Sequence, residues 1–152
     1  MAPRVFTSVP EIGAAVGQDL GTTSPVRITQ DLVNRFADVT GDQQWIHVDV
    51  ARAAASSMGG TIAHGYLTLS MIPAFAQQLF ALEAGSARLN YGLEKVRFPA
   101  PVPVGSSIHG SALIKDVQTV PAGTRVAVAW TVEIAGGTRP VCVAESITLV
   151  VP

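Results

Sequence analysis

Apolar and polar positions divide this chain into a helical first half and a stranded second half. Helices are predicted from apolar spacing and capping residues over residues 9–17, 30–40, 50–57 and 65–82. Ser8, Thr29 and Asp49 are the expected N-caps of the first three, and for Asp49 this role is favoured over that of a third catalytic acid. Residues 42–48 fit neither the helical nor the strand period, so we expect a loop there.

The stretch over residues 65–82 is the longest and most apolar of the four. Its apolar residues cover most of the helix circumference, which is typical of a helix buried on all sides. Pro73 lies inside this stretch and removes one backbone donor, so we expect a kink at this point rather than a break. The sequence therefore predicts one long central helix against which the rest of the chain packs.

After Gly85 the alternation of apolar and polar residues replaces the helical period. The predicted strands cover residues 88–98, 106–117, 125–134 and 140–151. Gly136-Gly137 is the expected hairpin turn before the last strand. Helices followed by strands indicate an α+β fold with an antiparallel sheet, and the long buried helix indicates that this sheet curls around it. We find no internal repeat and no linker, so residues 1–152 are interpreted as one domain.

Composition restricts the class of protein. The 152 residues are 48% hydrophobic and 14% charged, with a net charge of −1, which excludes a basic surface for nucleic acid. The apolar helical run is too short to cross a bilayer, and the N-terminus lacks the apolar region of a signal peptide. Cys142 is the single cysteine, which rules out an internal disulfide and fits a reducing compartment. We therefore expect a cytoplasmic protein that binds neither nucleic acid nor membranes.

Ionisable side chains concentrate just before the predicted long helix. Asp42 and His47 lie five residues apart in the predicted loop, and a loop that folds back can bring a carboxylate and an imidazole onto one water molecule. The pair can then orient and deprotonate that water, and one of the two can return a proton. Gly65 opens the helix, where the backbone N–H has no partner within the helix and can bind a developing oxyanion.

Three segments resemble a known family. FADVTGDQQWIHVD and GGTIAHGYLTL resemble the hydratase motif of the MaoC-like (R)-specific enoyl-CoA hydratases and dehydratases, and VRFPAPVPVG resembles a strand and turn that recur later in that family. The first of these motifs is most similar to that of the small single-domain, NodN-like bacterial members. The resemblance implies a hot-dog fold, in which an antiparallel sheet wraps around a long central helix, and it implies pairing as a homodimer.

The resemblance also implies residue roles and a reaction. Asp42 and His47 would hold and activate water, and the N–H of Gly65 would bind the thioester oxygen. The reaction would be the reversible addition of water to a trans-2-enoyl thioester, which gives an (R)-3-hydroxyacyl thioester. No metal or redox cofactor is implied, since coenzyme A, or an acyl-carrier protein, arrives with the substrate. Pro73 stands where some members have a serine, so any hydroxyl contribution comes from Ser70 or Thr68, or is absent.

Five further residues are candidates for contact with the substrate: His64, Asn90, Tyr91, Gly92 and Arg97. His64 is expected to fix the loop by hydrogen bonding, with direct substrate contact as the alternative. The three residues of the strand either border the acyl pocket or form an ordinary strand with a glycine bulge. Arg97 either meets the phosphates of coenzyme A or is an ordinary surface charge.

The sequence leaves two other functions open. A hot-dog thioesterase places its acidic residue differently, and the Asp-x4-His spacing counts against it. A non-catalytic acyl-thioester-binding or partner subunit typically lacks the aspartate–histidine pair that this chain retains. A metal site is disfavoured, because the histidines and aspartates lack the spacing of the common zinc motifs.

Overall fold

The computed structural model describes residues 2–152, which fold into six short helices and eight strands. The helices are α1 (Val9–Ala14), α2 (Gln30–Thr40), α3 (Trp45–Val48), α4 (Val50–Ala55), α5 (Gly65–Ser70) and α6 (Ile72–Leu79). The strands are β1 (Arg4–Phe6), β2 (Asp19–Thr22), β3 (Val26–Arg27), β4 (Phe80–Leu82), β5 (Ala87–Arg97), β6 (Ser107–Val120), β7 (Gly123–Ile134) and β8 (Pro140–Val151). None of the helices among these residues is long and apolar enough to cross a membrane.

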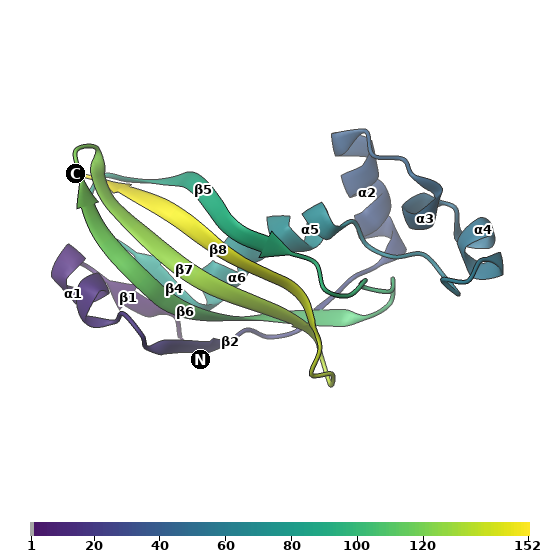
Figure 1. Cartoon of the computed structure of the whole chain (residues 1–152), viewed down its shortest axis with the longest axis horizontal. Coiled ribbons are helices and arrows are strands. Elements are labelled where there is room, and N and C mark those ends of the chain that lie inside the picture. Colours follow the sequence, from purple (N-terminus) through teal and green to yellow (C-terminus); the bar gives the residue numbers. More distant parts are fainter. Residues whose placement is uncertain (1) are drawn as a thin grey trace.

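The main sheet has six strands, all paired antiparallel. Its order is β2-β6-β7-β8-β5, and β3 pairs with β6 beside β2. The long strands bend together over α5 and α6, while α2, α3 and α4 gather at one end of the molecule (Figure 1). The predicted α+β arrangement, an antiparallel sheet that curls around helical structure, is confirmed.

The predicted helix caps are confirmed. The side-chain oxygens of Ser8, Thr29 and Asp49 each accept a hydrogen bond from the backbone N–H three residues further on. Gly41 ends α2 in the left-handed conformation, with φ of 80°, which glycine adopts without steric cost. The three capping side-chain oxygens each satisfy one of the N–H groups that the first turn of a helix leaves without a partner.

The expectation of one long helix over residues 65–82 is wrong. Helix α5 ends at Ser70 and α6 begins at Ile72, with Met71 between them. Pro73 lies in the first turn of α6, where a missing N–H removes no intrahelical hydrogen bond. The proline therefore starts a second helix instead of kinking the first. Residues 80–82 are also not helical, because they form β4 and pair in parallel with β1.

The expectation that this helix is buried on all sides is also wrong. Leu67, Ile72, Phe75 and Leu79 face the core, but Tyr66 at the start of α5 is 70% exposed. Further along, the polar residues on the other side of α6 also remain exposed. The apolar content of residues 65–82 is high because these residues line a cavity, described below, as well as the core.

Smaller differences lie in the loop and the strands. The segment expected to be a loop over residues 42–48 contains the short helix α3. The N-terminal strands β1 and β2 have no apolar alternation and were not predicted. The limits of the four long strands differ from those predicted by at most three residues. The register of β5 against β8 shifts between Asn90 and Gly92, so the strand does carry a bulge there.

The core lies between α6 and the concave face of the sheet. Phe75 of α6 is fully buried and packs over Gly110 of β6. A Cβ added at Gly110 would lie 2.9 Å from the Phe75 ring, so only glycine fits at this crossing of helix and strand. This contact sets how closely the helix approaches the sheet.

The Gly110–Phe75 contact predicts a stability difference. Gly110→Ala should lower the free energy of unfolding by about 1–3 kcal/mol, because an extra methyl overpacks the core. Gly13→Ala is the matched control, since its Cβ would meet no atom within 4 Å and alanine favours the helix. Urea unfolding measures both, and equal stability of Gly110→Ala and the unaltered protein would contradict this packing.

Candidate active site

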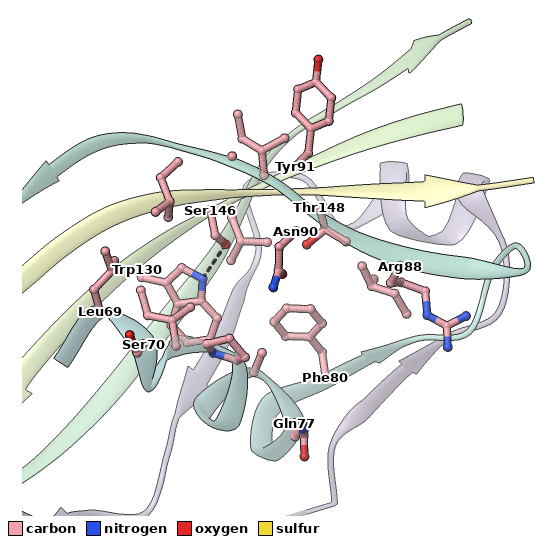
Figure 2. Close-up of a pocket in the computed structure, with 18 of the residues that line it drawn as sticks. Leu69, Ser70, Gln77, Phe80, Arg88, Asn90, Tyr91, Trp130, Ser146 and Thr148 are labelled. Carbon is pink, nitrogen blue, oxygen red and sulfur yellow. Dashed lines mark hydrogen bonds between the residues drawn. The ribbon is translucent and has the colours of Figure 1, made fainter. Parts of the chain in front are cut away.

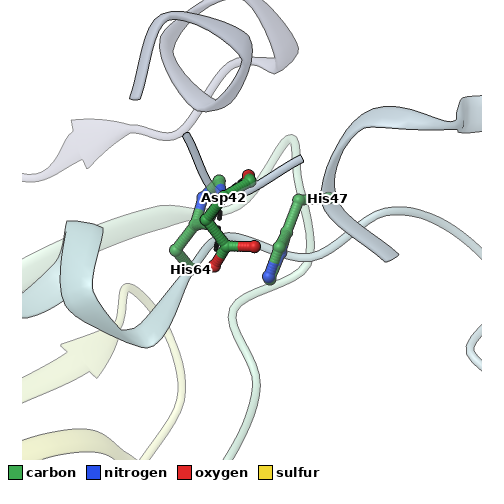
Figure 3. A group of neighbouring side chains, drawn as sticks. All are labelled: Asp42, His47 and His64. Atoms are coloured by element: carbon green, nitrogen blue, oxygen red, sulfur yellow. Dashed lines mark hydrogen bonds and ion pairs between the residues drawn. The ribbon is translucent and has the colours of Figure 1, made fainter. Parts of the chain in front are cut away.

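Asp42, His47 and His64 come from three separate elements and meet at one point (Figure 3). Asp42 follows the end of α2, His47 lies in α3, and His64 is the N-terminal flanking residue of α5. One potential ligand atom from each residue lies within 4.8 Å of the others. The fold thus brings together the two predicted catalytic side chains, and it adds His64 to them.

The tautomer of His47 follows from its hydrogen bond. This side chain is buried, and its Nδ1 lies 2.7 Å from the carbonyl oxygen of Ile62. A carbonyl oxygen can only accept, so Nδ1 carries the hydrogen and Nε2 keeps its lone pair in the neutral ring. His47 is therefore held ready to take a proton through Nε2.

A polar network that sequence reasoning missed holds the backbone of His47. The side-chain amide of Gln30 donates to the His47 carbonyl oxygen at 2.7 Å, and the Thr61 hydroxyl donates to the Gln30 amide oxygen at 2.6 Å. Gln30 is the first residue of α2, so this network ties α3 to the start of that helix. Nothing in the local sequence distinguishes Gln30 from any other residue after a helix cap.

Asp42 presents its carboxylate to solvent. The side chain is 49% exposed, and Oδ1 accepts a weak hydrogen bond from the N–H of Gln44 at 3.3 Å. The carboxylate oxygen Oδ2 lies 4.0 Å from Nε2 of His64. A carboxylate in this position can accept a hydrogen bond from a water molecule that also reaches His47.

Gly65 offers a free backbone donor and little room for a side chain. No backbone acceptor is found for its N–H within residues 2–152. A Cβ added at Gly65 would lie 3.0 Å from the ring of Phe98, which covers this turn of the chain. Phe98 was not identified from the sequence, because it lies 33 residues further along and reaches Gly65 only through the fold.

A cavity of about 840 Å³ lies along α6 (Figure 2). It begins at Leu69 and Ser70 and runs along α6 between the helix and strands β5, β7 and β8. Leu69 is four residues from Gly65, which is about 6 Å along a helix. Asp42, His47 and His64 do not line the cavity, so the polar cluster lies outside it.

The predicted substrate contacts on β5 fall on both sides of the strand. All three residues line the cavity, but the Asn90 side chain points into it, whereas the ring of Tyr91 points away (Figure 2). The Tyr91 ring instead lies under the guanidinium of Arg125, 4.9 Å from its centroid. Arg97 does not line the cavity; its guanidinium bonds the Val96 carbonyl oxygen at the exposed end of the strand.

The far wall of the cavity was also missed from the sequence. Trp130 of β7 donates its indole N–H to the Ser146 hydroxyl of β8 at 3.0 Å, and Thr148 lies further along the same strand. Phe80 faces them from the helical side. These residues meet because β7 and β8 pair in one register, which the sequence pattern alone does not fix.

The cluster is better arranged for proton transfer than for a cation. Nε2 of His64 lies 3.0 Å from the backbone carbonyl oxygen of Asp42, so it donates there. His64 would have to give up this bond to offer Nε2 to a metal. His47 keeps Nε2 free, next to an exposed carboxylate, which is the arrangement needed to hold and deprotonate water.

The class of protein is defined by a curled antiparallel sheet around α5 and α6, with an aspartate–histidine pair at the end of α5. The solved structure of R-hydratase PhaJ1 from Pseudomonas aeruginosa has the same fold, with a TM-score of 0.75 and 26% identity over 95% of this chain and 85% of that one. The (R)-hydratase of A. caviae gives a TM-score of 0.73 at 22% identity, over 89% of this chain and 96% of that one. The hot-dog fold is therefore confirmed.

Sequence comparison gives the family. The sequence model described as "MaoC like domain" matches residues 11–136. 3-Hydroxyacyl-thioester dehydratase Z of Mycobacterium tuberculosis H37Rv is 49% identical over 145 residues, which cover 95% of this chain and 96% of that protein. Nodulation protein N of Rhizobium meliloti is 39% identical, over 93% of this chain and 90% of that protein. The chain belongs to the MaoC-like dehydratase family, and the expectation of a hydro-lyase is confirmed at that level.

Cys142 lies outside this site, and its environment makes it unreactive. Burial raises the pKa of its thiol to about 11, so roughly one molecule in a thousand carries the thiolate at pH 8. We expect a thiol reagent such as DTNB to label the native protein far more slowly than the urea-unfolded protein at the same pH. Rapid, stoichiometric labelling of the native protein would contradict the burial of Cys142.

Proposed function

We propose that the protein is an (R)-specific hydratase that adds water reversibly to trans-2-enoyl thioesters to give (R)-3-hydroxyacyl thioesters. The observation that carries the proposal is the His47 ring, held by the Ile62 carbonyl with Nε2 free beside the Asp42 carboxylate. Membership of a dehydratase family and the similarity to 3-hydroxyacyl-thioester dehydratase Z support it. Direction is set by concentrations, so hydration and dehydration are the same activity.

The reaction needs one water molecule and one oxyanion donor. Water held between Asp42 and Nε2 of His47 loses a proton to His47 as its oxygen bonds to C3 of the enoyl group. The electrons of the double bond move onto the thioester oxygen, where the N–H of Gly65 stabilises the enolate. The enolate collapses as the protonated member of the Asp42–His47 pair returns a proton to C2. Water is thereby added without a metal or redox cofactor.

The acyl chain is proposed to occupy the cavity along α6. Ser70, Pro73 and Asn90 are part of its lining, so the position where some relatives have a serine carries a ring without a donor. The Ser70 hydroxyl donates to the Tyr66 carbonyl oxygen at 2.6 Å, and Thr68 is buried. Ser70 can therefore accept a hydrogen bond from the substrate but has no free hydrogen to donate.

The thioester carrier is proposed to be coenzyme A or an acyl-carrier protein in the cytoplasm. Its phosphates would lie outside the cavity, and Arg97 remains the predicted contact for them. Arg97 is exposed and immediately precedes Phe98, whose ring lies against Gly65. The carrier enters with the substrate, and no resident cofactor is proposed.

A second copy of the chain is proposed to cover β5. This strand is the edge of the sheet, and it is exposed on nearly its whole length. Leu89, Tyr91 and Leu93 are large apolar side chains on it, and Leu89 is 51% exposed. An edge strand with free backbone groups and apolar side chains can pair with the same strand of another copy. The homodimer would extend the sheet and cover the open side of the cavity.

The central activity test uses the catalytic pair. Asp42→Asn and His47→Gln should each reduce hydration of crotonyl-CoA and of a longer trans-2-enoyl-CoA by about 10²–10⁴-fold, because each removes an acid–base group. Loss of the conjugated enoyl absorbance measures the rate. His109→Gln is the control, since His109 faces Glu133 on the sheet.

Three outcomes would contradict this assignment. Near-normal rates in either variant would remove that residue from the mechanism. Release of free thiol by the unaltered protein would indicate a thioesterase. Binding of the thioester without turnover would indicate a non-catalytic subunit.

The Gly65 donor is tested by a pair of substitutions. Gly65→Ala keeps the N–H but pushes the methyl against Phe98, so we expect a rate loss that the double variant with Phe98→Ala partly restores. Gly65→Pro removes the N–H itself, and removal of one oxyanion donor costs about 10²–10³ in kcat. Gly65→Pro with a normal rate and a normal fold would show that the carbonyl binds elsewhere.

The edge strand predicts the assembly. Light scattering should give a mass of about twice 15.8 kDa for the unaltered protein. Leu89→Asp should shift it toward one chain, because the substitution places a charge in the proposed contact. Val39→Asp on α2, which is even more exposed, should leave the mass unchanged. A monomeric unaltered protein would contradict the dimer.

A further inference from the structure

His64 is the most enclosed polar side chain of the site. It is 2% exposed, and the ring of Phe36 from α2 packs against it with the centroids 5.0 Å apart. Although it stands at the N-terminal flank of α5, its side chain makes no capping hydrogen bond to the helix. Its contacts are directed instead to the two groups proposed to perform catalysis.

The hydrogen bonding of His64 shows that its Nε2 carries a hydrogen. Nε2 lies 3.0 Å from the backbone carbonyl oxygen of Asp42, so Nε2 carries the hydrogen. Nδ1 is buried and has no hydrogen-bond partner. His64 therefore makes its hydrogen bond through Nε2, while Nδ1 faces no hydrogen-bond partner.

The other face of His64 lies on the catalytic imidazole. The rings of His47 and His64 are stacked, with centroids 3.8 Å apart and planes inclined by 23°. The hydrogen bond to Ile62 alone would still let the His47 ring turn about the line of that bond. The stack against His64 restricts this rotation. One buried side chain thus contacts Asp42 through its backbone and His47 through its ring.

We propose that His64 is a positioning residue that fixes the distance between the Asp42 carboxylate and Nε2 of His47. It holds the chain at Asp42 by hydrogen bonding and the ring at His47 by stacking, and it touches no reacting atom. This inference rests on the proposed hydratase reaction for its effect on rate. Its structural part, a clamp through the Nε2–H group and the ring of His64, does not depend on that reaction.

Three substitutions separate the two contacts. His64→Phe keeps a ring for the stack and removes the donor, His64→Gln keeps a donor of similar reach and removes the ring, and His64→Leu removes both. We expect kcat to fall about 10- to 100-fold in His64→Leu and less in the other two, with KM changing less than kcat, because small misplacements of catalytic groups cost this much. Thermal unfolding identifies any variant that fails to fold.

Two kinetic outcomes would overturn the proposal. Rates within twofold of normal in all folded variants would show that His64 only fills space. Variants that are all as inactive as His47→Gln would make His64 itself a proton carrier. The matched control is His109→Gln, which removes a histidine from another part of the sheet.

Nitrogen-15 NMR of the unaltered protein tests the clamp without any turnover. The chain has three histidines, so each ring can be assigned by substitution. We expect His64 to carry a hydrogen on Nε2 and His47 to carry one on Nδ1. A His64 ring with its only hydrogen on Nδ1 would overturn the inference even if the protein is a hydratase. An inactive protein with the expected tautomers would overturn the proposed function and leave the clamp in place.

Discussion

The hydrogen bond from His47 Nδ1 to the Ile62 carbonyl is the interaction on which the site depends. It selects the tautomer that leaves Nε2 unprotonated, and without it the ring could present either nitrogen to solvent. The carbonyl stays in place because its chain segment is itself fixed. The N–H of Ala63 donates to the Val102 carbonyl oxygen at 2.8 Å, and the N–H of Val104 donates to the Thr61 carbonyl oxygen at 2.9 Å. The proline-rich connector after β5 therefore supports the position of His47.

The division of the central helix gives its two parts separate tasks. Helix α5 begins at Gly65 and presents a free N–H at the polar cluster, while α6 provides the apolar wall of the cavity. Pro73 is compatible with both, because it starts α6 in its first turn. The Gly110–Phe75 crossing then fixes α6 against the sheet, and the cavity lies on the side of α6 toward β5.

Local signals in the sequence predict local structure well here. The caps at Ser8, Thr29 and Asp49 depend on a side chain and a backbone group three residues apart, so they can be read from the chain directly. The long strands follow from apolar alternation. Pro73 misled the prediction because the same residue can kink a helix or begin one, and the choice depends on tertiary packing.

The candidate site could likewise be predicted from the sequence only in part. Asp42 and His47 were identified from spacing and family resemblance, and the fold brings them together as expected. Gln30 and Phe98 could not be identified, because their importance comes from contacts with residues 17 and 33 positions away. The predicted strand contacts Asn90, Tyr91 and Gly92 all line the cavity, but the Tyr91 ring points away from it, because successive side chains of a strand alternate between its faces.

The most direct test of the account is the stereochemistry of the product. The unaltered protein would be incubated with crotonyl-CoA, and the 3-hydroxybutyryl product would be released and resolved by chiral chromatography. The account predicts the (R) product with the thioester intact, in an amount equal to the enoyl thioester consumed. An (S) or racemic product, or free thiol in place of the hydroxyacyl thioester, would contradict it.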